Sequence, residues 1–119
     1  TPFADLGSIG VYNVIVDDSE FYKSMGLSIE YVRDGDYKAM GAPGKAWTDK
    51  EKEMIRAGVE KISIEFKSFV TTHRPEVTAD QMQGQCFTAS DPAASGLADF
   101  TAFTSAEEFI AHAARVAAL

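Results

Sequence analysis

The sequence predicts one α+β domain over residues 1–119, with a curved, mainly antiparallel sheet and about three helices. Three observations support this class. Short runs of β-branched and aromatic residues recur along the chain, Asp34-Gly35 has the composition of a tight hairpin turn, and two segments have the spacing of a helix capping box. A length of 119 residues with 45% hydrophobic residues is sufficient for a single core.

The first strand and helix follow from local composition. Segment 8–16 (SIGVYNVIV) is β-branched and aromatic and predicts a strand. Asp17, Asp18 and Ser19 offer side-chain oxygens that can cap a short helix. That helix ends near Met25, where Gly26 can adopt the left-handed conformation of a helix C-terminus.

A hairpin is expected next. Apolar and polar residues alternate over 27–32, and the Asp34-Gly35 turn leads into a return strand at 37–40. Turn chemistry therefore accounts for the acidic residues beside Gly35, which lack the further oxygens of a calcium loop.

The next helix begins at a capping box, but its end is ambiguous. Thr48 and Glu51 have the required spacing. Apolar residues over 55–69 follow helical spacing, yet 62–66 also alternates as a half-buried strand would. Taking Gly58 as the terminator predicts a helix at 49–57 and a strand at 60–70.

The last third predicts a loop, two strands and a helix. The polar segment after His73 is expected to form a loop with one helical turn near 78–82. Strands are predicted at 85–90 and 97–103, and Ser105 begins an amphipathic C-terminal helix.

Charge and composition exclude several classes of partner. The net charge is −7 and the sequence pI about 4.7, and no basic stripe is present, so nucleic acid is not an expected partner. No apolar run is long enough for membrane insertion, which predicts a soluble protein. Cys86 is the only cysteine, so an intramolecular disulfide is excluded. The start at Thr1 without Met suggests a processed or trimmed N-terminus and leaves the compartment open.

Several motifs resemble those of the vicinal-oxygen-chelate (glyoxalase-like) family. They are VYNVIV, Asp17-Asp18, Phe21-Tyr22, Met25-Gly26-Leu27, the hairpin IEYVRDGDYKAM, and CFTASDPAASGLADF. The resemblance implies paired modules around a metal held by His and Glu. Segment 10–13 has no His, however, and only Glu65 and Asp99 fall near ligand positions, so neither a metal nor another cofactor is expected.

The C-terminal segment LADFTAFTSAEEFIAHAARV resembles instead the dimeric α/β-barrel (ferredoxin-like) proteins, with His112 on the helix. That resemblance implies a homodimer enclosing an apolar ligand.

These features predict a binding protein for an apolar or aromatic small molecule, with no assigned catalytic residue. The expected ligand-binding residues are Asn13, Tyr31, Trp47, Phe66, His73 and Asp99. One alternative is a cofactor-free lyase, isomerase or oxygenase with His73, Tyr31 or Asp99 assisting proton transfer. Another is an accessory subunit that docks on a protein partner.

Overall fold

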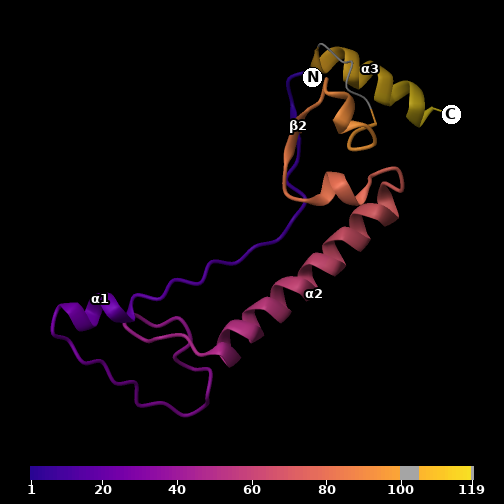
Figure 1. Cartoon of the computed structure of the whole chain (residues 1–119). Coiled ribbons are helices and arrows are strands. Elements are labelled where there is room, and N and C mark those ends of the chain that lie inside the picture. The colour runs from indigo at the N-terminus through magenta and orange to yellow at the C-terminus, as the bar shows by residue number, and fades with distance from the viewer. Residues whose placement is uncertain (100–104, 119) are drawn as a thin grey trace. The chain divides into compact units, whose positions relative to one another are not determined.

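The computed structural model describes residues 1–99 and 105–118. Within them, three α-helices, two 3-10 turns and one antiparallel strand pair are formed (Figure 1): β1 Asp5–Gly7, α1 Ser19–Ser24, α2 Asp49–His73, η1 Ala79–Met82, β2 Cys86–Thr88, η2 Pro92–Ala94 and α3 Ala106–Ala117. The chain divides into two compact units, Val11–Ile62 and the combination of Thr1–Gly10 with Ser63–Leu119. Each unit is described by itself below.

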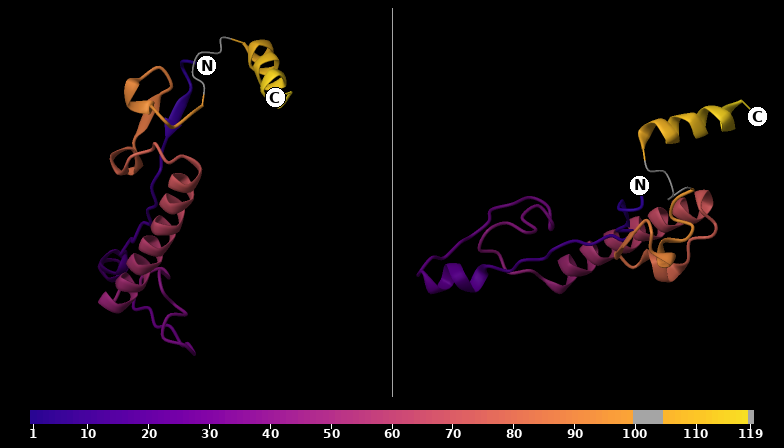
Figure 2. Two further views of the ribbon diagram at one scale, coloured as in Figure 1. Left: turned by 90° about the vertical axis from the view of Figure 1, so that its right-hand side faces the viewer. Right: turned by 90° about the horizontal axis from the view of Figure 1, so that it is seen from above.

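The longest element is α2, which remains helical through the segment expected to be a strand (Figures 1 and 2). The predicted helix 49–57 and strand 60–70 are therefore one helix, and the prediction of a strand was wrong. Gly58 costs a helix interior about 1 kcal/mol relative to alanine. The surrounding Glu, Lys, Met and Ala residues favour helix, and the apolar residues over 55–69 keep their helical spacing throughout.

The unit formed by Thr1–Gly10 and Ser63–Leu119 contains a small apolar core. Ile9, Val77 and Met82 are buried there, and Val70 and Leu97 pack against them. The core is next to the strand pair, whose register places Leu6 opposite Phe87. Two three-residue strands make a marginal sheet, so this core and the end of α2 must supply much of the unit's stability.

The predicted sheet is not formed by the described residues, and the fold class was wrong. Segments 8–16, 27–32 and 37–40 have the composition of strands but form none, and the neighbouring strand β1 lies earlier. Strand composition does not create a strand without a hydrogen-bonding partner. Neither a glyoxalase-like nor a ferredoxin-like sheet is therefore present in the described residues.

The predicted starts of α1 and α3 are confirmed, although the N-cap residue of α1, Asp18, makes no side-chain capping hydrogen bond. The short helix α1 is present, and Gly26 after it has a positive φ of 76°. Ser105 caps α3, accepting a hydrogen bond from the Glu108 N–H, and η1 occupies the predicted turn. The predicted strand 85–90 contains β2, whereas most of 97–103 lies outside the described residues.

We predict that Gly7→Ala destabilises the unit containing the strand pair by about 2 kcal/mol. Gly7 has a φ of 123°, and a Cβ there would collide with the carbonyl oxygen of Gln85, which also accepts the Ser8 N–H. Gly58→Ala is the matched control, because open space surrounds that position and alanine should stabilise α2 by about 1 kcal/mol. Urea unfolding followed by circular dichroism measures both effects. A Gly7→Ala midpoint equal to that of the parent chain would contradict the argument.

Candidate functional site

In the unit Val11–Ile62, two aspartates at the start of α1 form hydrogen bonds with the long loop that connects α1 to α2. The Asp18 carboxylate accepts the Gly44 N–H at 2.7 Å, and the Asp17 carboxylate accepts the Trp47 N–H at 3.2 Å. The indole N–H of Trp47 donates to the Val16 carbonyl at 2.8 Å. These three hydrogen bonds bring together chain positions far apart in sequence, so the residues between them form a closed loop.

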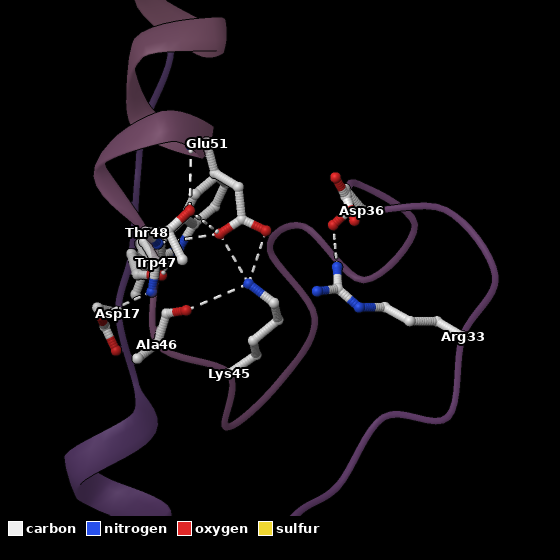
Figure 3. Close-up of polar contacts among 9 residues, drawn as sticks. Asp17, Arg33, Asp36, Lys45, Ala46, Trp47, Thr48 and Glu51 are labelled. Carbon is white, nitrogen blue, oxygen red and sulfur yellow. Dashed lines mark hydrogen bonds and ion pairs between the residues drawn. The ribbon is translucent and has the colours of Figure 1, made fainter.

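The same loop is tied to the start of α2 by a buried ion pair (Figure 3). The Lys45 ammonium lies 2.7 Å from both carboxylate oxygens of Glu51, whose side chain is almost fully buried. Glu51 also accepts the N–H of Thr48 at 2.9 Å, while the Thr48 hydroxyl accepts the Glu51 N–H at 3.2 Å. The predicted capping box is thus confirmed. The hydrogen bond from Lys45, followed by that from Thr48, lowers the pKa of Glu51 to about 2.

Lys38 lies in a turn within this loop. Gly35 has a φ of 96°, and its carbonyl accepts the Lys38 N–H at 3.2 Å. The Arg33 guanidinium donates to the backbone carbonyl of Asp36 (Figure 3), which closes the same turn from the other side. Lys38 is exposed and forms no ion pair with any described residue, although its neighbour Ala39 is buried.

Lys50, in the first turn of α2, contacts the aromatic ring of Tyr37. The Lys50 ammonium lies 5.3 Å from the centroid of the Tyr37 ring, a cation–π distance. Interaction with the Tyr37 side chain, followed by the charge of Asp36, raises the pKa of Lys50. Lys50 is therefore held as a cation against the turn.

The six predicted ligand-binding residues divide between the two units: Asn13, Tyr31 and Trp47 belong to one, and Phe66, His73 and Asp99 to the other. Within the first unit the polar groups of Tyr31 and Trp47 bond to different backbone carbonyls, those of Pro43 and Val16. Asn13 lies exposed on an extended segment. The polar groups of Tyr31 and Trp47 are therefore both engaged with the backbone of this unit.

In the second unit, Asp99 is paired with arginine. The Arg74 guanidinium donates two hydrogen bonds to the Asp99 carboxylate, at 2.8 and 2.9 Å. This pairing lowers the pKa of Asp99. His73, at the end of α2, folds back on its own helix, with Nδ1 2.9 Å from the Phe69 carbonyl and the two rings 4.3 Å apart. Asp99 therefore acts as a structural anion in this unit, and Phe66 is an exposed residue of α2.

An open cavity of about 510 Å³ adjoins the Arg74–Asp99 pair in this second unit. Its lining includes Leu97, Ser105 and Phe109, but the Ser105 hydroxyl already accepts the Glu108 N–H. No serine hydroxyl in the described part of the chain hydrogen-bonds to a lysine or to His73. A nucleophile and its base are therefore not assembled among these groups.

Residues 1–99 and 105–118 contain no group of three or more His, Cys, Asp or Glu side chains placed to hold a metal ion. No helix in these ranges combines the length and apolar character needed to cross a membrane.

The sequence matches the family described as peptidase family S49 over residues 1–118. The chain belongs to this family. It is also 27% identical over 97 residues to "Putative protease MJ0651" from Methanocaldococcus jannaschii. That similarity covers 79% of this chain but only 31% of the curated protein, so the chain matches about a third of its relative.

The family match corrects the resemblances inferred from sequence. The glyoxalase-like and ferredoxin-like assignments were wrong, because the S49 match spans nearly the whole chain whereas the earlier motifs were short and local. A strand, a capped helix and an Asp-Gly turn occur in many α/β and α+β folds. The prediction of a small-molecule binding protein was also wrong, since the match is to a family of peptidases.

We predict that Glu51→Gln lowers the thermal stability of the chain at neutral pH, since glutamine cannot form the ion pair with Lys45. In the parent chain the pKa of Glu51 lies below its usual 4.5. Its contribution to stability is therefore complete above pH 4.5 and is lost as the pH falls towards about 2. Calorimetry as a function of pH should show a flatter profile for Glu51→Gln in this window.

Glu53→Gln is the control for this experiment. Glu53 pairs with Arg56 at 3.6 Å, and both side chains are exposed, so its loss should change the melting temperature little. Equal decreases in melting temperature for the two variants would show that the buried Lys45–Glu51 pair contributes no more to stability than an exposed pair.

We also predict that Asp17→Ala shifts the fluorescence of Trp47, the single tryptophan, towards that of a solvated indole. The variant removes the acceptor of the Trp47 N–H. Hydrogen bonds from Ser19, followed by that from Trp47, lower the pKa of Asp17. The parent spectrum should therefore hold as the pH falls to the usual aspartate value of 3.8 and change only below it. Asp34→Ala, in the exposed turn, is the control and should leave the spectrum unchanged.

Proposed function

We propose that this chain is part of a serine peptidase that cleaves peptide bonds, and that it supplies the general base while a serine outside residues 1–119 supplies the nucleophile. The observation that carries this proposal is the S49 match over residues 1–118. The name of the relative from M. jannaschii, which describes a protease, supports the same reaction.

The absence of a serine–base pair among the described residues supports an external nucleophile. A serine hydroxyl attacks a carbonyl only when a base within hydrogen-bonding reach accepts its proton. The hydroxyls of Ser19 and Ser24 instead donate to Asp17 and to a backbone carbonyl. Because the match covers 31% of the relative, most of a related polypeptide lies outside the matched region.

Lysine is the base type that this chain offers best. Serine peptidases use either histidine or lysine as the base. His73 is turned onto its own helix, with one ring nitrogen against the Phe69 carbonyl. A lysine acts as a base only in its neutral form, so a neighbouring carboxylate is unfavourable for this role.

Comparison of the lysines selects Lys38. Lys23 and Lys45 are each paired with a glutamate, and Lys50 has a raised pKa. Lys61 is adjacent to Glu60 in the sequence, on the surface of α2. Lys38, like Lys52, Lys61 and Lys67, forms no ion pair with a described residue. Of these four lysines it alone lies on a loop rather than on α2, and catalytic side chains are commonly presented on loops by a scaffold.

The contacts around this turn suit a catalytic position. The hydrogen bonds from Gly44 and Trp47 to the two aspartates close the loop at its base, and Lys50 packs on Tyr37 beside Lys38. A base must be held close to its productive geometry, so a restrained turn is better suited than a free one.

We predict that Lys38→Ala lowers peptide hydrolysis about a thousandfold in a polypeptide that contains this chain together with the rest of an S49 domain. Hydrolysis of unfolded casein and labelling by a fluorophosphonate probe are the measurements. The 119-residue chain alone should be neither active nor labelled, because it lacks the nucleophile.

Lys61→Ala and Lys67→Ala are the matched controls, since both lysines lie on α2 and should retain activity. Loss of activity in Lys67→Ala with activity retained in Lys38→Ala would identify Lys67, on α2, as the general base instead of Lys38. A labelled serine within the 119-residue chain would overturn the assignment of an external nucleophile.

A further inference from the structure

Lys38 lies in a run of short turns between residues 35 and 45. Backbone hydrogen bonds of 3.2 Å form this run, each from an N–H to the carbonyl three residues earlier, with Lys38, Met40, Ala42 and Lys45 as the donors. Bonds of this kind fix the local bends of the chain. They do not fix where the run lies in the unit Val11–Ile62, so the position of Lys38 depends on contacts that cross the loop.

The end of the run that follows Lys38 is held in place. Asp18 accepts the Gly44 N–H, and Lys45 pairs with Glu51 at the start of α2 (Figure 3). Gly44 has a φ of 73°, and a Cβ at this position would collide with the Ile29 side chain. This end of the loop is therefore a fixed point, next to α1 and to the start of α2.

Tyr31 connects the segment before Lys38 to this fixed point. Its hydroxyl donates to the Pro43 carbonyl at 2.5 Å, between residues 12 positions apart in the chain. Among the described residues, no other hydrogen bond joins segment 27–32 to segment 41–48. Because Lys38 lies between Tyr31 and Pro43 in sequence, this hydrogen bond closes the part of the loop that carries Lys38.

The other contacts of the turn do not hold the segment before it. The Arg33 guanidinium donates to the Asp36 carbonyl three residues later, which is a local contact within the turn (Figure 3). Lys50 lies over the Tyr37 ring and does not contact segment 27–32 through a hydrogen bond or ion pair. The Tyr31 hydroxyl therefore has a part in shaping the loop that neither of these contacts can replace.

We propose that Tyr31 is a positioning residue for the general base, because its hydrogen bond to Pro43 holds the loop in the shape that presents Lys38 to the serine. This inference rests on the proposed function. A base must lie within hydrogen-bonding reach of the hydroxyl that it deprotonates, and a displacement of about 1 Å can lower a rate about a hundredfold. Tyr31 transfers no proton in this scheme, since its hydroxyl is engaged with a backbone carbonyl.

Tyr31→Phe tests the hydrogen bond alone, because it removes the hydroxyl and keeps the ring. In a polypeptide that contains this chain together with the rest of an S49 domain, kcat for peptide hydrolysis should fall about tenfold, with KM within about twofold of the parent value. Tyr12→Phe is the matched control, since Tyr12 is 86% exposed, and it should leave both constants unchanged. A raised KM with unchanged kcat in Tyr31→Phe would overturn the inference in favour of a role in substrate binding.

A double-mutant cycle distinguishes positioning of Lys38 from a general loss of stability. Because Tyr31 is proposed to act through Lys38, Tyr31→Phe should not further lower the residual hydrolysis of Lys38→Ala. A further loss of about tenfold in that background would overturn the inference, since Tyr31 would then act independently of Lys38.

Hydrogen–deuterium exchange gives a readout that does not depend on catalysis. In the same polypeptide, Tyr31→Phe should speed exchange of the amides of residues 38–42 about tenfold, because the loop loses its closing contact. Tyr12→Phe should not change it. Equal exchange in Tyr31→Phe and in the parent would overturn the inference.

The activity of Lys38→Ala separates this inference from the proposed function. Full activity of Lys38→Ala would refute Lys38 as the base assigned under the proposed function. An inactive Lys38→Ala, together with a Tyr31→Phe variant that matches the parent in kcat, would overturn the positioning inference alone. An inactive Lys38→Ala with a slowed Tyr31→Phe supports both.

Discussion

The buried contact between Lys45 and Glu51 is the interaction on which the unit Val11–Ile62 most depends. A buried carboxylate is tolerated only when its charge and lone pairs are satisfied, and here Lys45 and Thr48 satisfy them together. The same carboxylate defines the first turn of α2. One residue therefore joins the loop to the helix, and the loop cannot move away from α2 without leaving an unpaired charge in a buried position.

This polar construction explains how the unit holds a defined loop with almost no apolar core. The aspartates at the start of α1 accept backbone N–H groups from Gly44 and Trp47, which would otherwise require water. Such contacts fix geometry but supply little net stabilisation, since each replaces a hydrogen bond to solvent. Hydrophobic burial must then come from elsewhere, and the exposed side chains of residues 11–16 and 27–32 are those available to supply it.

The elements that could be predicted from sequence are those fixed by neighbours in the chain. Thr48 and Ser105 mark where α2 and α3 begin, because a capping side chain acts within one helical turn. Apart from β2, which falls within the predicted strand 85–90, the strands could not be predicted correctly, because a strand needs a partner that sequence does not identify. The end of α2 was misjudged because Gly58 was given more weight than the stripe around it. The Arg74–Asp99 pair joins residues 25 apart, and no local pattern marks it.

The candidate site was hard to recognise for a related reason. An arrangement of serine and lysine is defined by geometry, and its members need not be close in sequence. Lys38 has no motif around it beyond an Asp-Gly turn, and aromatic residues such as Tyr31 and Trp47 drew attention to a ligand pocket instead. In the structure the Tyr31 hydroxyl donates to the Pro43 carbonyl within the loop that carries Lys38, and the Trp47 indole donates to the Val16 carbonyl before α1. Aromatic side chains can thus fasten a loop to neighbouring backbone instead of lining a ligand pocket, and only the identity of their hydrogen-bond partners separates the two roles.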